Sequence, residues 1–159
     1  MQIGIESDGP SQDLTEFSLI LEITRLNETG TTSLRFVNPQ SEVFLDNADY
    51  VFAMDSDAIK NDEMTSSGNT GGQIEFFDFN VDDKNTSVTS LKLLASVDVV
   101  HVLEGADPAA SSVDQFEISV GDDSLFLPVG DFPPEIEFTS TPGLVTINAV
   151  AIPEPSSVA

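Results

Sequence analysis

Two acidic loops carry the residues of this sequence that are best suited to chemistry. Each loop has several carboxylates and amides within a few positions of one another. The candidate ligands are Asp55, Asp57 and Asp62 in the first loop and Asp78, Asn80 and Asp82 in the second. Calcium is bound by oxygen ligands of this kind and requires neither Cys nor His. The spacing therefore predicts calcium as the cofactor, if the protein holds one.

The second loop begins like the calcium-binding loop of an EF-hand. That motif needs Gly at its sixth position and Glu at its twelfth, whereas this sequence has Asp83 and Thr89 there. An EF-hand is therefore excluded. A solvated acidic face without a specific ion is the alternative interpretation of both loops.

The sequence does not indicate an enzyme. It contains no Cys, which excludes thiolate catalysis, disulfides and Cys-based zinc sites. His101 is the single histidine, and it stands in an apolar run without a serine motif beside it, whereas a triad needs a nucleophile, a base and an orienting group. We expect His101 to be a strand residue with a structural hydrogen bond. Carboxylate pairs can hydrolyse glycosides, but one Tyr and no Trp leave few sugar-stacking rings.

The charge balance limits the classes of binding partner that can be expected. The chain has 28 acidic and 5 basic residues, which gives a net charge of −23. Binding to nucleic acid or to an anionic membrane requires clustered Lys and Arg, so neither partner is expected. Salt or calcium should stabilise such a chain by screening its self-repulsion.

Alternating apolar and polar residues predict strands. The clearest case runs from Phe17 to Ile23, where one face is apolar. Further strands are predicted over 33–37, 42–45, 73–79, 115–120, 124–129, 136–139 and 144–150, with a polar loop over 55–72. The apolar run 88–103 also predicts strand, although 89–96 fits a helix as well. Short strands separated by turn residues are typical of an all-β, jelly-roll-like sandwich of two antiparallel sheets, here one domain over residues 1–150.

Strand parity also predicts the core. Five phenylalanines are expected to point inward: Phe17, Phe36, Phe76, Phe116 and Phe138. Phe77 follows Phe76 directly and must face the other side of its strand. Some outward apolar surface should therefore be covered by a loop, by the second sheet or by another subunit.

The C-terminal sequence Ile152-Pro153-Glu154-Pro155 resembles the start of the PEP-CTERM sorting signal of exported bacterial proteins. This resemblance implies that an exosortase processes the precursor and that Pro153, Glu154 and Pro155 belong to the sorting signal. It also implies a protein outside the cell or on its surface, whose signal peptide has been removed and whose mature chain does not span the membrane. Residues 151–159 would then be an extended segment beyond the domain.

The rest of the chain more weakly resembles the cohesin-like β-sandwich ectodomains that precede such signals. The resemblance is carried by Tyr50-Val51-Phe52, by Phe77-Asp78-Phe79 and by the stretch from Phe138 to Ile147. It implies a jelly-roll that binds proteins or glycans. We expect a structural or adhesive protein that self-associates in an extracellular matrix or filament; the alternative is a cohesin-like module that binds a protein or glycan ligand.

Overall fold

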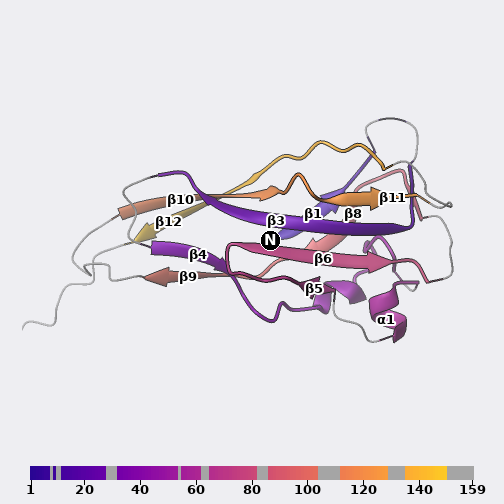
Figure 1. The fold of residues 1–159 in the computed structure, drawn as a ribbon, viewed down its shortest axis with the longest axis horizontal. Helices are drawn as coiled ribbons and strands as arrows, with labels where there is room; N and C mark the ends of the chain where they lie inside the picture. The colour runs from indigo at the N-terminus through magenta and orange to yellow at the C-terminus, as the bar shows by residue number, and fades with distance from the viewer. Residues whose placement is uncertain are drawn as a thin grey trace, which may run out of the picture.

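The longest strand, β3 (Glu16–Arg25), lies at the centre of a large antiparallel sheet (Figure 1). The computed structural model describes residues 1–7, 9, 12–27, 32–53, 55–61, 65–81, 86–103, 112–128 and 135–149. The large sheet has the order β12–β10–β3–β6–β5, and β11 also pairs with β3. Its other members are β5 (Ser66–Ser67), β6 (Gln73–Phe79), β10 (Ser112–Val120), β11 (Leu125–Leu127) and β12 (Gly143–Ala149).

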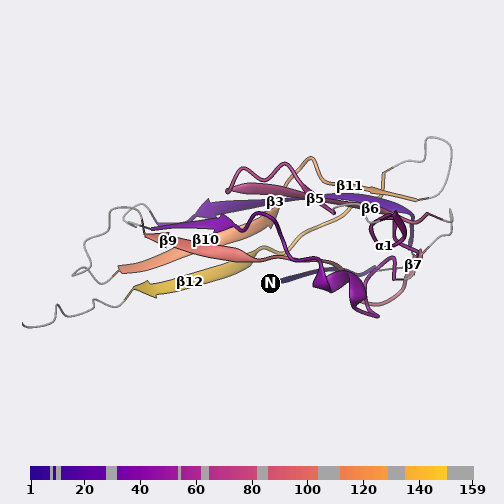
Figure 2. The same cartoon turned by 90° about the horizontal axis from the view of Figure 1, so that it is seen from below.

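The described residues also form three two-stranded sheets, β1–β8, β2–β7 and β4–β9. Their strands are β1 (Gln2–Ile5), β2 (Gln12–Leu14), β4 (Thr32–Phe36), β7 (Thr86–Val88), β8 (Lys92–Ser96) and β9 (Val99–Leu103). All pairings between named strands are antiparallel. In Figure 2, β3, β6 and β11 form the upper layer and the N-terminus lies below them.

One core lies between the large sheet and the small ones. It combines residues of the large sheet, such as Phe17 and Phe76, with residues of the small sheets, such as Leu34 and Leu94. The prediction of an all-β protein with antiparallel sheets is confirmed. The finer prediction of a jelly-roll order of strands stays a prediction.

The core positions follow strand parity in four of the five predicted cases. Phe17, Phe36, Phe76 and Phe116 are buried. Phe138 is 38 % exposed, so that prediction was wrong. The reason is that residues 135–140 form no strand, and the Phe138 ring instead packs edge-on against Phe126 at 5.0 Å.

Several predicted elements differ from the structure. The expected strand 42–45 is a 3-10 helix, η1 (Val43–Asp46), and the expected strand 136–139 has no ladder partner. The expected loop 55–72 contains α1 (Asp57–Asn61) and β5. Short helices are missed because one side chain can stabilise them: the Ser56 hydroxyl accepts the Ile59 N–H at 3.2 Å, as an N-cap does.

The apolar run 88–103 contains no helix. It holds the end of β7, then β8 and β9, which are separated at Val97 and Asp98. Two hydrogen bonds stabilise the interruption between these strands. The Asp98 carbonyl accepts them from Val37 N and from Gln40 Nε2, each at 3.0 Å. β1 and β2 were not predicted. The PEP segment, Pro153 to Pro155, lies outside the described residues.

No helix in the described part of the chain is long and apolar enough to cross a membrane.

Candidate functional site

The first predicted calcium loop is folded around α1. The Asp55 carboxylate pairs with Lys60 Nζ at 3.1 Å, and the Asp57 carboxylate accepts a hydrogen bond from the Asn61 side chain. Asp62 lies outside the described residues. Both described carboxylates thus have partners within their own loop.

The second predicted calcium loop begins with a buried carboxylate. Asp78 is 1 % exposed and accepts hydrogen bonds from the hydroxyls of Tyr50 and Ser56, each at 2.5 Å. The backbone N–H groups of Ala58 and Phe79 also donate to it, at 3.3 and 2.9 Å. Buried carboxylates require such donors because desolvation penalises their charge. Asp78 therefore holds β6 to the turn before α1.

The structure brings the two predicted loops together. Val81 N donates to the Asp55 carbonyl at 2.9 Å, and Ser56 forms a β-bridge with Asn80, which is itself buried. Asp82 lies outside the described residues. Within the described ranges no group of three or more His, Cys, Asp or Glu side chains is placed to hold a metal ion.

Burial of the phenol and, after it, the negative charge of Asp78 raise the pKa of Tyr50 above its usual range. Tyr50 is enclosed by rings, with Phe44 at 5.5 Å and Phe52 at 6.4 Å between centroids. This environment keeps the hydroxyl protonated, so it remains a hydrogen-bond donor to Asp78. The Tyr50 hydroxyl therefore stabilises the fold, and at 1 % exposure Tyr50 is not accessible to a substrate.

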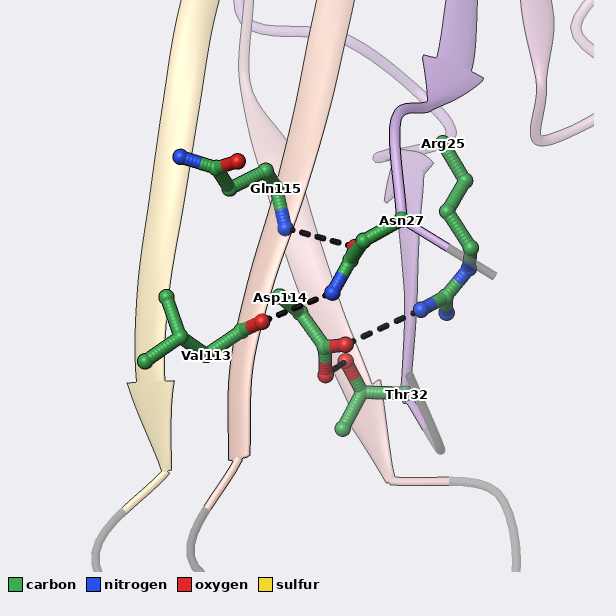
Figure 3. Close-up of polar contacts among 6 residues, drawn as sticks. All are labelled: Arg25, Asn27, Thr32, Val113, Asp114 and Gln115. Atoms are coloured by element: carbon green, nitrogen blue, oxygen red, sulfur yellow. Dashed lines mark hydrogen bonds and ion pairs between the residues drawn. The ribbon is translucent and has the colours of Figure 1, made fainter. Parts of the chain in front are cut away.

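A second buried carboxylate, Asp114 on β10, was not predicted (Figure 3). Its oxygens accept from Arg25 Nη1 at 3.0 Å and from the Thr32 hydroxyl at 2.5 Å. The Thr32 hydrogen bond, followed by the charge of Arg25, holds the pKa of Asp114 below its usual range against the opposing effect of burial. Asp114 thereby links β10 to β3 and β4. Strand parity could have predicted the burial of Asp114, because Asp114 lies two residues before the buried Phe116 and therefore on the same face of β10.

His101 lies on β9 opposite Leu34. Its Nε2 atom is buried, and in the described part of the chain it has no hydrogen-bond partner. The predicted structural hydrogen bond is therefore not made at this nitrogen.

The edge strand β12 is the candidate site for contact with another molecule. β12 pairs with β10 from Gly143 opposite Ile118 to Ala149 opposite Ser112, and β10 is its one ladder partner in the described chain. The half-buried side chains of Val145 and Ile147 pack against the core. On the outer face of the strand, the side chains of Leu144, Thr146 and Asn148 are exposed.

Charge distinguishes β12 from its surroundings. No Asp, Glu, Lys or Arg occurs between Glu137 and Glu154 in a chain whose net charge is −23. Natural edge strands are commonly protected by charged side chains, prolines, bulges or short length. The opposite end of the same sheet follows that rule, since β5 has two residues. β12 has seven residues and an unbroken register with β10.

A groove of about 730 Å³ runs between β1 and the segment from Ile136 to Thr141. Its apolar lining includes Ile3, Ile5 and Phe138, and Glu6 and Glu137 add carboxylates. This groove is the described feature that best fits the alternative expectation of a ligand-binding module.

In the described residues the protein is all-β with antiparallel sheets, and its edge strand β12 has no charged side chain. No protein-family model matches the sequence, and neither the search of curated proteins nor the search of solved structures returns a match.

Proposed function

We propose that this protein is a structural or adhesive component that self-associates by adding strands at the free edge of β12. The observation that carries the proposal is the seven-residue, uncharged edge strand in a strongly acidic chain. The proposed location outside the cell or on its surface rests on the resemblance of Pro153-Glu154-Pro155 to a sorting signal.

Electrostatics favours β12 as the contact between identical copies. Two copies with a net charge of −23 repel each other wherever their carboxylates approach. The two β12 strands that would meet in such a contact have no charged side chains. Their backbone N–H and C=O groups can form hydrogen bonds, which do not depend on the net charge of the chains. The cost of bringing two acidic chains together is therefore lowest at such a segment.

The edge strand β9 is a weaker candidate for the same role. It also lacks Asp and Glu, and Val100 on it is 44 % exposed. However, β9 has five residues, and Asp98 and Glu104 stand directly beside its ends in sequence. We therefore place the contact at β12.

The test is a measurement of mass in solution by sedimentation and light scattering over a range of protein concentrations. The unmodified chain should associate, and more strongly at high salt, because the screening length falls from about 8 Å at 0.15 M to about 3 Å at 1 M. Thr146→Lys should abolish the association, since a charge on an edge strand opposes strand addition.

Thr24→Lys is the matched control. Thr24 is also an exposed threonine on the outer face of the large sheet, but it lies on the central strand β3. This variant should associate like the unmodified chain. A chain that stays monomeric at millimolar concentration and high salt would overturn the proposal.

Calcium binding by the two acidic loops is a separate part of the proposal. The support is that the structure joins the segments that carry Asp55 and Asn80, through the hydrogen bond from Val81 N to the Asp55 carbonyl and the bridge between Ser56 and Asn80. Titration of the chain with calcium at constant ionic strength should then raise its melting temperature, and magnesium at the same concentration should raise it less because Mg²⁺ demands a stricter geometry. Equal effects of both ions would indicate screening alone.

The groove beside β1 supports a second candidate function, the binding of a ligand. A binding module should take up a peptide or oligosaccharide saturably, with the same affinity in the unmodified chain and in Thr146→Lys. Saturable binding in a monomeric chain would favour this function over assembly.

A further inference from the structure

We infer that two copies of the chain pair antiparallel along β12, about a twofold axis that passes beside Thr146. This inference rests on the proposed function and specifies its geometry. It follows from the position of β12 at the edge, from the faces of its side chains and from its length.

The faces of the sheet limit the pairings that are allowed. A twofold axis perpendicular to the sheet is the operation that places two identical edge strands side by side and antiparallel. It keeps the inner faces of both copies on the same side. Residues that face the core therefore pair with core-facing residues of the second copy, and outward residues pair with outward ones.

The length of the strand sets the register. β12 extends from Gly143 to Ala149, so Thr146 is its middle residue. When Thr146 pairs with Thr146 of the second copy, every residue of the strand gains a partner. Moving the axis by one residue would leave the last two residues at one end of each strand unpaired.

This register also gives compatible side-chain pairs. On the inner face, Val145 lies opposite Ile147 of the second copy, and both residues already pack against the core of their own chain. Cross-strand pairs of β-branched residues stabilise antiparallel sheets, as do Thr–Thr pairs. On the outer face, Leu144 lies opposite Asn148 of the second copy. No acidic side chain of β12 takes part, since the strand has none.

The geometry implies a closed dimer. A twofold contact uses the same edge in both copies, so β12 is consumed when one partner binds. The product is one continuous sheet across two chains, with a mass of twice 17.0 kDa. Growth into a filament or matrix would then require a second contact surface.

Single cysteines test the register, because the chain contains no cysteine of its own. Thr146→Cys should form a disulfide-linked dimer under mild oxidation, since directly opposed residues of an antiparallel pair meet the Cα spacing that a disulfide requires. Leu144→Cys should not, because the two copies of residue 144 lie about 13 Å apart along the strands. A mixture of Leu144→Cys and Asn148→Cys should give the crossed dimer.

Gln115→Cys is the matched control. Gln115 lies opposite Thr146 on β10, one strand in from the edge. Three strand spacings, roughly 14 Å, would separate its two copies, so it should not cross-link. Reaction of each thiol with a small maleimide confirms that the sites are accessible.

The outcomes separate this inference from the proposed function. Association of the unmodified chain without cross-linking of Thr146→Cys would overturn the β12 pairing and leave self-association standing. Cross-linking of Leu144→Cys with itself would indicate either a parallel contact or an antiparallel one in another register, and would also overturn the inferred pairing. A chain that is monomeric under all conditions would overturn both.

Discussion

Asp78 and Asp114 are both almost completely buried, at 1 % and 0 % exposed, but their charges are stabilised in different ways. Asp114 lies 3.0 Å from the guanidinium of Arg25, whose side chain is 28 % exposed. The donors to Asp78 that the structure describes are two hydroxyls and two backbone N–H groups, all neutral.

The difference follows from where each carboxylate lies in the sandwich. Asp78 belongs to β6, which ends at the right of Figure 1 close to α1, and it is enclosed by the turn that carries Tyr50. Asp114 is near the start of β10, at the left, opposite Ile147 of the edge strand β12. A long cationic side chain can reach the second position while part of it stays in water, since the Arg25 side chain is 28 % exposed. The comparison indicates that Asp78 stabilises the contact between β6 and the turn before α1. Asp114 stabilises the other end of the sandwich, where β10 pairs with the edge strand β12.

Removal of Asp78 should have the largest effect. Asp78→Ala deprives two hydroxyls and two backbone N–H groups of their acceptor, and we expect a loss of about 3 to 5 kcal/mol in the free energy of unfolding. Urea denaturation followed by circular dichroism measures it. Asp78→Asn retains one acceptor oxygen and should lose less. A loss below about 1 kcal/mol in Asp78→Ala would contradict the assigned role.

Asp114→Asn should lose about 2 kcal/mol at neutral pH, because Arg25 can be rehydrated and the amide still accepts one hydrogen bond. The folded-state pKa of Asp114 is lowered. Its contribution is therefore present above the pKa of an unfolded Asp, about 4, and is lost as the pH falls below that value. The stability gap between the unmodified chain and Asp114→Asn, measured from neutral to acidic pH, should close. A gap that widens in acid would contradict this sign.

Tyr50→Phe should lose about 1 to 2 kcal/mol, since one hydrogen bond to Asp78 disappears while the ring and its contacts remain. The pKa of Tyr50 is raised, so the hydroxyl stabilises the fold below the pKa of an unfolded Tyr, about 10, and this contribution is lost as the pH rises further. Tyr50 is the single tyrosine, so tyrosinate absorbance reports on it alone. Titration of that absorbance near pH 10 in the folded protein would show that the hydroxyl is not buried.

The smallest effect is expected at the exposed ion pair between Lys60 and Asp55, whose side chains are 32 % and 33 % exposed. Lys60→Ala should change the free energy of unfolding by less than about 1 kcal/mol, because exposed pairs are screened by solvent. The change should vanish at high salt. If Lys60→Ala lowered the free energy of unfolding as much as Asp114→Asn does, the prediction that exposed ion pairs contribute less than buried ones would be wrong.

Local patterns in the sequence were sufficient for much of the fold. Alternation along 17–23 predicted the central strand β3 and the burial of Phe17. Parity also predicted that Phe76 and Phe77 face opposite sides of their strand, and Phe76 is buried whereas Phe77 is 39 % exposed. Parity works here because successive side chains of a strand point to opposite faces. Patterns failed at η1 and α1, which have four and five residues and are too short to show a helical period.

The acidic composition, the absence of cysteine and the uncharged stretch before Glu154 are properties that can be read from the printed chain. They limit the chemistry, and the uncharged stretch is the basis of the proposed contact between two copies. The position of β12, which lies within that stretch, at the edge of the large sheet and the burial of Asp78 and Asp114 were decided by tertiary structure. The physical reason is that an edge strand and a central strand have the same alternation, so their place in the sheet depends on which strands pair across long separations in sequence. A carboxylate likewise becomes buried when distant donors, such as Tyr50 for Asp78 and Arg25 for Asp114, meet it in the folded chain.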